Sequence, residues 1–328
     1  MNAVLSAENL SVGYARRTVL ADITAALLPG ELVCLIGANG VGKSTLLRTL
    51  AGMQPPLAGR ALLLGDEVQR LDLRARAKRL SLVLTERVDA GMMTAYALVA
   101  LGRYPHTDWS GRLSAHDDAV VRRALAAVGA SDFAQRNIDE LSDGERQKVF
   151  IARALAQEPA VILLDEPTAW LDVPRRAEIM RVLRVLAHES GRAVLLSTHD
   201  LDLALRSADR LWLLAHDGRL HVGAPEDLVL NGALAAAFVT EGLEFDVHSG
   251  AFRLSKTHLL PVHLAGHGLR ALWTARALER AGFRASGEPC PLTIDVLEDG
   301  RWRLTSGQQS ARYSTLYDLL MALRKSLP

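Results

Sequence analysis

Short apolar runs alternate with longer amphipathic stretches along most of the chain. Such runs lie at residues 32–36, 80–84, 161–164, 193–197 and 211–214. Runs of this length, separated by helical patterns, are typical of strands buried on both faces of a parallel sheet. The pattern therefore predicts an α/β core in which helices cover a largely parallel sheet.

Two regions depart from this rhythm. The first thirty residues or so alternate polar and apolar positions around turn residues, which predicts antiparallel strands in a β flap. Residues 90–160 have mainly helical periodicity, with a loop expected at Gly102–Pro105. We interpret them as a helical insertion into the α/β core.

The pattern changes again after Leu228, where a short helix and then a hairpin at 245–254 are expected. Beyond them a strand, a helix, two strands and a last helix predict a small, separate α+β domain. The expected strands lie at 260–264, 292–297 and 301–304, and the expected helices at 270–281 and 315–325. The predicted domains are 1–245, with a helical subdomain at about 90–160, a linker or hairpin over 246–256, and the α+β domain over 257–328.

Composition excludes some classes of partner. The 328 residues carry 38 Lys and Arg against 37 Asp and Glu, a formal net charge of +1. No broad positive field is available to hold nucleic acid, so we expect no nucleic-acid partner. The sequence has no apolar stretch of about 18 residues and no basic signal-peptide start, so we expect a cytoplasmic chain. Cys34 and Cys290 are far apart and are expected to stay reduced.

A glycine-rich segment follows the first apolar run. Residues 37–45 read Gly-Ala-Asn-Gly-Val-Gly-Lys-Ser-Thr, a full match to a phosphate-binding loop. Its glycines let backbone N–H groups converge on phosphates, Lys43 adds a point charge, and Ser44 can ligate Mg²⁺. The alternative is an ordinary glycine turn, but the preceding strand, the spacing and the Lys-Ser pair together favour the phosphate loop.

Two further strands end in polar residues. Asp165 and Glu166 follow the run at 161–164, and His199 follows the run at 193–197. Because ligands of parallel sheets gather at the carboxyl ends of strands, we expect Asp165 to hold Mg²⁺ and Glu166 to face the attacking water. The acidic pair could instead form a turn or helix cap, and the histidine could be structural.

A second anion-binding segment precedes a helix predicted over 146–157. Ser142 offers a hydroxyl and Gly144 a backbone N–H at the positive end of that helix. One chain cannot use both this segment and the phosphate loop on one triphosphate, whereas a head-to-tail dimer can. Taken alone, the segment could be a capped helix start.

These motifs in series resemble the ATP-binding subunit of an ABC transporter, and the resemblance covers about residues 2–245. It implies a P-loop NTPase core of ABC type, an ATPase coupled to transmembrane transport, with ATP and Mg²⁺ as cofactors. Catalysis would use Lys43, Glu166 and His199. Tyr14 would stack on adenine, unless it belongs to the flap core. The nucleotide would be bound by Tyr14, Gly37, Asn39, Gly40, Gly42, Lys43, Ser44, Thr45, Ser142, Gly144 and Asp172, and Mg²⁺ by Ser44 and Asp165.

The chain departs from that family at two places. The glutamine that usually reaches Mg²⁺ and water is replaced by Thr85, with Glu86 next to it as a candidate substitute ligand. The family's signature segment is here Ser142–Glu145, and its Asp143 and Glu145 add two negative charges near a triphosphate. Arg146 is a candidate to offset their repulsion of the phosphates. We therefore predict an active ATPase whose turnover is slower or depends more on its partners.

Residues 99–106 are similar to the corresponding segment of iron-chelate and cobalamin importers. The resemblance implies a homodimer on the cytoplasmic face of the membrane, bound to integral-membrane permease subunits and, through them, to an extracytoplasmic substrate-binding protein. Met92, Met93 and Tyr96 would receive permease helices or form plain helical core. The cargo itself is read by the permease and not by this chain.

Other functions stay open from the residues alone. A soluble ABC ATPase without a permease would usually carry two nucleotide modules, and an ABC subunit could serve a different cargo. A kinase of another P-loop class would have no use for Ser142–Glu145. For residues 257–328 we expect a regulatory or dimer-supporting role. Gly266–Gly268 there half-matches a second nucleotide fingerprint, although a tight turn is the simpler interpretation.

Overall fold

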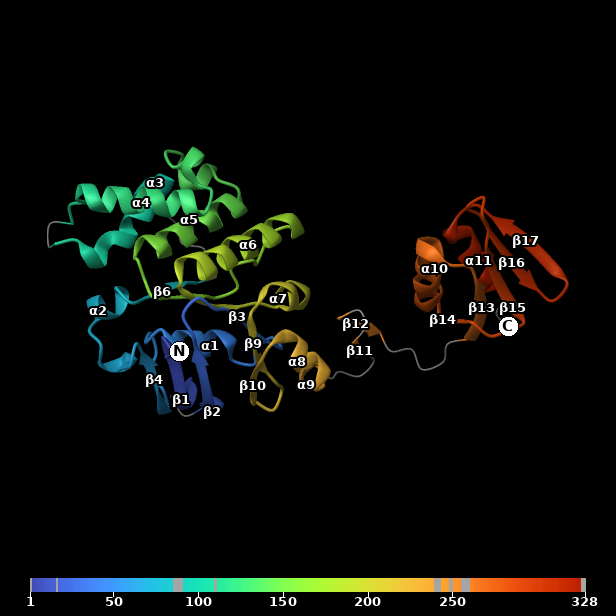
Figure 1. Cartoon of the computed structure of the whole chain (residues 1–328), viewed down its shortest axis with the longest axis horizontal. Helices are drawn as coiled ribbons and strands as arrows, with labels where there is room; N and C mark the ends of the chain where they lie inside the picture. The colour runs from blue at the N-terminus through green and yellow to red at the C-terminus, as the bar shows by residue number, and fades with distance from the viewer. Residues whose placement is uncertain are drawn as a thin grey trace. The chain divides into compact units, whose positions relative to one another are not determined.

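A computed structural model describes residues 2–15, 17–84, 91–108, 111–238, 243–247, 250–254 and 260–325. The chain divides into two compact units (Figure 1). Unit 1 comprises Met1–Thr240 and Phe245–Phe252, and unit 2 comprises Glu241–Glu244 and Arg253–Pro328. Among the described residues, no helix is both long and apolar enough to cross a membrane.

Unit 1 is built on a six-stranded sheet in the order β10-β9-β3-β8-β7-β6. All neighbouring pairs are parallel except β10 and β9, so the predicted α/β sheet is confirmed. The strands are β3 (Leu32–Gly37), β6 (Leu80–Val83), β7 (Val161–Leu164), β8 (Ala193–Ser197), β9 (Arg210–Leu214) and β10 (Leu220–Gly223).

The central strands are apolar throughout because both faces of the sheet are covered. Along β3, Cys34 and Ile36 pack into one hydrophobic cluster, whereas Val33 and Leu35 pack into the other. Burial raises the pKa of the Cys34 thiol, which keeps it protonated and unreactive. The covering helices are α1 (Lys43–Leu50), α6 (Val173–Ser190), α7 (Leu201–Ser207), α8 (Pro225–Leu230) and α9 (Ala233–Ala237).

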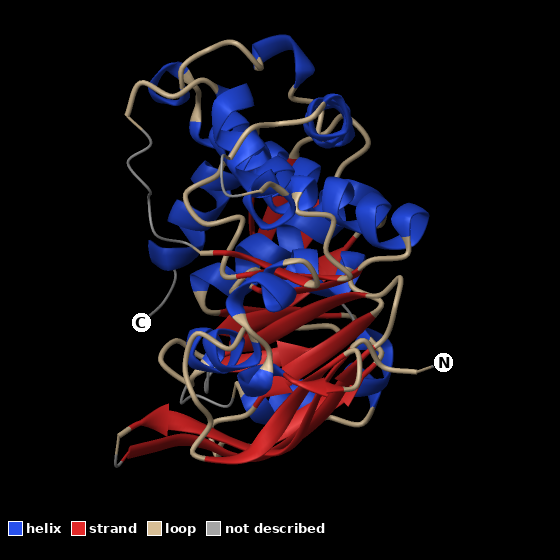
Figure 2. Ribbon diagram, turned by 90° about the vertical axis from the view of Figure 1, so that its left-hand side faces the viewer, coloured by secondary structure: helices blue, strands red, loops and turns tan. Residues whose placement is uncertain are grey.

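The β flap and the helical insertion lie on opposite sides of this sheet (Figures 1 and 2). The flap is an antiparallel sheet in the order β2-β1-β4-β5. The alternating pattern of the first thirty residues predicts β1 and β2, but β4 and β5 were not predicted. Its strands are β1 (Leu5–Tyr14), β2 (Arg17–Leu27), β4 (Ala58–Leu63) and β5 (Asp66–Glu67), followed by η1 (Val68–Arg70) and α2 (Leu73–Ala77). The insertion contains α3 (Ala95–Ala100), η2 (Leu101–His106), α4 (Ala115–Ala127), η3 (Ser131–Phe133), η4 (Ile138–Glu140) and α5 (Asp143–Ala156).

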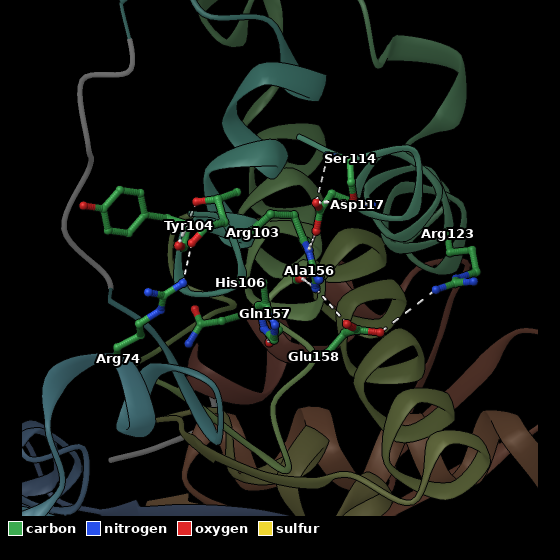
Figure 3. A network of polar contacts seen from close by, with 11 residues as sticks. Arg74, Arg103, Tyr104, His106, Ser114, Asp117, Arg123, Ala156, Gln157 and Glu158 are labelled. Carbon is green, nitrogen blue, oxygen red and sulfur yellow. Dashed lines mark hydrogen bonds and ion pairs between the residues drawn. The ribbon is translucent and has the colours of Figure 1, made fainter. Parts of the chain in front are cut away.

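The prediction of a loop at Gly102–Pro105 is wrong, because this segment forms the 3₁₀ helix η2. Its Arg103 is only 2% exposed. The Nε of Arg103 donates to Asp117 at 2.8 Å, and its Nη1 donates to the Ala156 carbonyl at 2.7 Å and to Glu158 at 2.8 Å (Figure 3). Hydrogen bonds from the hydroxyl and N–H of Ser114, and then Arg103, lower the pKa of Asp117 to about 2. This buried network ties η2 to the end of α5 and to α4.

Unit 2 contains a five-stranded sheet in the order β14-β13-β15-β16-β17, and the predicted α+β class is confirmed. The pattern missed β14, which is short, and β17, whose residues are mostly exposed at a sheet edge. Gly266 has φ +137°, and a Cβ there would lie 2.8 Å from Val296, which supports the tight turn. The elements are β13 (Leu260–Ala265), α10 (Gly268–Ala281), β14 (Phe283–Ser286), β15 (Leu292–Val296), β16 (Trp302–Ser306), β17 (Gln309–Tyr313) and α11 (Leu316–Lys325).

Candidate nucleotide site

The phosphate loop joins the end of β3 to the start of α1. A Cβ at Gly37 would lie 2.7 Å from the Leu214 carbonyl, and one at Gly42 2.6 Å from Val19, so both positions require glycine. Lys43 is 6% exposed, and its Nζ donates to the carbonyls of Gly37 at 2.9 Å and Ala38 at 3.1 Å. The ammonium therefore lies over the loop, where it can meet a phosphate. Partial burial lowers the pKa of Lys43, and an added anion would reverse that effect.

Three oxygen-bearing side chains converge beside the loop. The Oδ1 of Asp165 accepts hydrogen bonds from the Ser44 hydroxyl at 3.0 Å and from the Ser197 hydroxyl at 2.7 Å. The N–H of Glu166 donates to the same Ser197 hydroxyl at 2.9 Å. The Ser44 hydroxyl and the Asp165 carboxylate are hard oxygen donors of the kind Mg²⁺ prefers, so the residues fit this ion.

Glu166 and His199 come from the ends of neighbouring strands. The Nδ1 of His199 lies 3.6 Å from the Glu166 carboxylate. Glu166 has φ +48°, a left-handed backbone that costs a residue with a side chain about 1 kcal/mol or more. Such conformations cluster at functional sites, and here the strained residue is the predicted catalytic carboxylate.

A cleft of about 800 Å³ opens above the phosphate loop. Tyr14 is 54% exposed at its wall, and its hydroxyl lies 3.3 Å from the Thr45 hydroxyl. An exposed ring is available for stacking, whereas a flap-core tyrosine would be buried. The cleft is lined by Tyr14, Arg17, Thr18, Val19, Asn39, Gly40, Val41, Gly42, Lys43, Ser44, Thr45, Glu166, His216, Asp217 and Gly218.

Sequence reasoning missed Arg17 and the segment 216–218 in this lining. Residues 216–218 follow β9, which pairs with β3, so they lie at the same edge of the sheet as the phosphate loop. The rule that ligands gather at the carboxyl ends of parallel strands could have identified them. Arg17 opens β2 and pairs with Tyr14 across the flap hairpin.

The signature segment forms a capped helix start. Helix α5 begins at Asp143, not at Arg146 as predicted, because Ser142 is its N-cap. The Glu145 carboxylate accepts from the Ser142 N–H at 2.8 Å and from its hydroxyl at 2.7 Å, while the Glu145 N–H donates to that hydroxyl at 3.4 Å. The hydrogen bonds from Ser142 lower the pKa of Glu145. The Glu145 carboxylate is thus held against the amino-terminal end of its own helix.

Asp172 plays a similar local role, since it is the N-cap of α6 and accepts from the Arg175 N–H at 3.0 Å. As far as the described residues go, the lining of the cleft includes neither Asp172 nor Ser142 and Gly144. Ser142 and Gly144 therefore do not line the cleft of their own chain, whereas Asp143 lines a small neighbouring pocket of about 50 Å³ together with Asp165 and Glu166. Thr85 and Glu86 lie outside the described residues.

Two family profiles match this chain. The ABC transporter profile matches residues 20–169, and the profile of the iron ABC transporter C-terminal domain matches residues 260–324. The first covers the phosphate loop and Asp165–Glu166, and the second covers nearly all of the described part of unit 2.

Relatives and solved structures extend the match. The cobalamin import ATP-binding protein of Halobacterium salinarum is 40% identical over 294 residues, covering 87% of this chain and 73% of that protein. The ferric enterobactin transport ATP-binding protein of Escherichia coli is 38% identical over 227 residues, covering 69% and 84% respectively. A dimeric ATP-binding cassette in a post-hydrolysis state with ADP and Pi is 26% identical, with a TM-score of 0.58, covering 67% of this chain and 98% of that one.

Proposed function

The chain belongs to the ABC transporter family, as one of its ATP-hydrolysing subunits, and from this premise we propose that it drives the import of iron chelates or cobalamin. The names of the relatives and the iron-transporter profile over 260–324 support this cargo class. The observation that carries the ATPase function is the convergence of Lys43, Ser44 and Asp165 at one edge of the sheet.

We propose that two copies of the chain clasp each nucleotide between them. In this arrangement the phosphate loop of one copy holds the triphosphate, and Ser142 and Gly144 of the other copy approach the terminal phosphate. The separation of Ser142 from the cleft of its own chain supports this arrangement, as does the dimeric cassette that the chain resembles. Asp172 would lie at the same interface.

Hydrolysis would be an in-line attack by water on the terminal phosphate. Mg²⁺ held by Ser44 and Asp165 would neutralise phosphate charge. Glu166 orients the water and accepts its proton, while Lys43 stabilises the transferring phosphoryl group. His199, close to the Glu166 carboxylate, contacts the terminal phosphate and helps to place that side chain.

The variant Glu166→Gln tests the clasp. The amide keeps the shape of the side chain but cannot accept the proton, so hydrolysis should fall by about 100-fold or more while ATP binding persists. ATP should then trap a stable dimer, visible by light scattering after size-exclusion chromatography. A variant that binds ATP but stays monomeric at high protein concentration would refute the clasp.

A second cavity in unit 1 suits the membrane partner. It has a volume of about 650 Å³ and lies between α2 and η2, with Leu73, Leu80, Tyr104 and Pro105 in its wall. Arg74 braces the wall, since its Nε donates to the Pro105 carbonyl at 2.8 Å. We propose that a cytoplasmic helix of the permease occupies this groove and so holds the chain at the inner face of the membrane.

The segment expected to receive the permease is only partly suited to that role. Met92 is 88% exposed, but Tyr96 packs against the core and its hydroxyl donates to Asp118.

Substitution of Leu73 in the wall of the groove tests the proposed permease contact. Leu73→Asp should release the chain from the membrane fraction, whereas Leu230→Asp, an equally exposed position on α8, should not. Equal retention of both variants at the membrane would refute the groove.

A further inference from the structure

Arg175 lies across the start of α5, although it belongs to the first turn of α6. Its Nη1 donates to the Ser142 hydroxyl at 2.6 Å. A Cβ placed on Gly144 would meet that Nη1 at 2.8 Å and the Arg175 Cδ at 2.9 Å. The guanidinium thus covers both residues that the clasp presents to the terminal phosphate, and a glycine at 144 gives it the space.

The surroundings of this cation are unusual. The amino-terminal ends of α5 and α6 are both positive, so a guanidinium between them is electrostatically unfavourable unless anions balance it. Asp172 lies 3.7 Å from its Nε, and the Glu145 carboxylate, which accepts from the same Ser142 hydroxyl, is near enough for Arg175 to help lower its pKa. The short hydrogen bond of Arg175 is made to a neutral hydroxyl. A phosphate would be the stronger acceptor for a fork-shaped donor.

Two other nearby arginines, Arg146 and Arg176, contact backbone carbonyls and carboxylates of their own chain. Arg146 lies 3.7 Å from Asp143 and donates to the Leu141 carbonyl at 3.3 Å. Arg176 donates to the Leu171 carbonyl at 2.7 Å and lies 3.4 Å from Asp200. Arg136 lies 3.6 Å from the Glu145 carboxylate, whereas Arg175 donates to the Ser142 hydroxyl itself.

We propose that Arg175 is a nucleotide-binding residue that acts in trans, donating to the terminal phosphate of the ATP held in the phosphate loop of a second copy. The inference rests on the clasp of the proposed function and adds to it a positive charge matched to Asp143 and Glu145. On closure, Arg175 exchanges the Ser142 hydroxyl for phosphate oxygens, and the Ser142 hydroxyl turns its proton from the Glu145 carboxylate to the same phosphate. The positive charge of Arg175 thereby offsets the repulsion between the two signature carboxylates and the triphosphate.

The first test uses the Glu166→Gln chain as the parent. Adding Arg175→Ala should leave ATP binding by the dilute monomer unchanged but raise the ATP concentration needed for dimerisation by about tenfold or more. Arg175→Lys should recover part of the loss, since it keeps the charge but not the fork. Arg181→Ala, an exposed arginine on the same helix, is the matched control and should behave as the parent.

The second test separates action in trans from action in cis. Chains with Lys43→Ala and chains with Arg175→Ala, both on the Glu166→Gln background, are mixed with ATP. If Arg175 acts in trans, each mixed dimer contains one composite site with both residues intact, so dimers should form that neither variant forms alone. If it acted in cis, every site would be defective and mixing would recover nothing.

Two results would overturn the inference. Arg175→Ala with unchanged ATP-driven dimerisation would leave the residue a structural tie. Tighter dimerisation would make it a latch that occupies Ser142 and opposes closure. Both are distinct from failure of the clasp itself, in which the Glu166→Gln parent already fails to dimerise.

Discussion

The two halves of the predicted site differ in how ready they are for a nucleotide. In the phosphate-loop half (Gly37–Thr45 with Asp165, Glu166 and His199), Lys43 and Ser44 are already aimed at one open cleft. In the signature half (Ser142–Glu145 with Asp172 and Arg175), the Ser142 hydroxyl is bonded within its own chain. The first half lines an open cleft of its own chain, whereas Ser142 in the second must redirect its proton from Glu145 before it can donate to a phosphate.

This difference separates binding from closure. A preorganised phosphate loop captures ATP without a partner, because little reorganisation is needed. The signature half stabilises the closed dimer only if phosphate oxygens replace the hydrogen bonds that it already makes. Its contribution to closure therefore depends on the terminal phosphate being present. Loss of that phosphate on hydrolysis would return Ser142 to Glu145 and Arg175, which favours opening.

The largest effect is expected in the phosphate-loop half. Lys43→Ala removes the buried ammonium that lies over the loop, and the affinity of the monomer for ATP should fall by about 100-fold, since hydrogen bonds to charged groups are the strong ones. Equilibrium binding of a fluorescent ATP analogue measures it, with circular dichroism to check the fold. Retained affinity would show that the loop backbone alone holds the phosphates.

An intermediate effect is expected in the signature half. Ser142→Ala should leave monomer affinity for ATP unchanged but weaken ATP-driven dimerisation by about tenfold. It also removes a helix cap, at a cost of about 1 kcal/mol in stability. Ser114→Ala is the matched control, because Ser114 forms the same capping box on α4 and should lose stability without loss of dimerisation. Equal loss in both variants would reduce Ser142 to a cap.

A smaller effect is expected at the rim of the cleft. Tyr14→Ala should weaken ATP binding by about fivefold, since stacking of a base on an aromatic ring is worth about 1 kcal/mol or more. Tyr14→Phe keeps the ring but loses the contact with Thr45, and should retain nearly full affinity. Binding of GTP alongside ATP shows whether the ring selects between bases. An alanine variant with normal affinity would place the base elsewhere in the cleft.

The two halves also differ in how far the sequence predicts them. The phosphate loop is contiguous, and its glycines are required by a close approach to the Leu214 carbonyl at Gly37 and by positive φ at Gly40 and Gly42, so residue order alone identifies it. Arg175 is separated from Ser142 by the whole of α5 and β7, and only packing brings them together. His216–Gly218 reach the cleft through the pairing of β9 with β3, and for them the rule that ligands gather at the carboxyl ends of parallel strands provides a sequence signal. Edge strand β17 was missed because its residues lack an apolar face.

The smallest effect is expected from Glu145, one of the two acidic residues of the signature segment. Glu145 was predicted to repel the triphosphate, but its carboxylate is bonded to Ser142 and lies 3.6 Å from Arg136. Glu145→Gln removes the charge and keeps a side chain that can still form the capping box. ATPase turnover should therefore rise by less than about threefold.

The pH dependence provides a sharper version of the same test. Hydrogen bonds from Ser142 lower the pKa of Glu145 below its usual value, so the carboxylate stays ionised as pH falls until that lowered pKa is reached. Its contribution to stability is present at neutral pH and is lost only in acid. Parent and Glu145→Gln should thus have pH–turnover profiles of the same shape above about pH 6. A parent profile that rises steeply on mild acidification, absent in the variant, would mean that the charge does face the nucleotide and that Arg175 does not offset it.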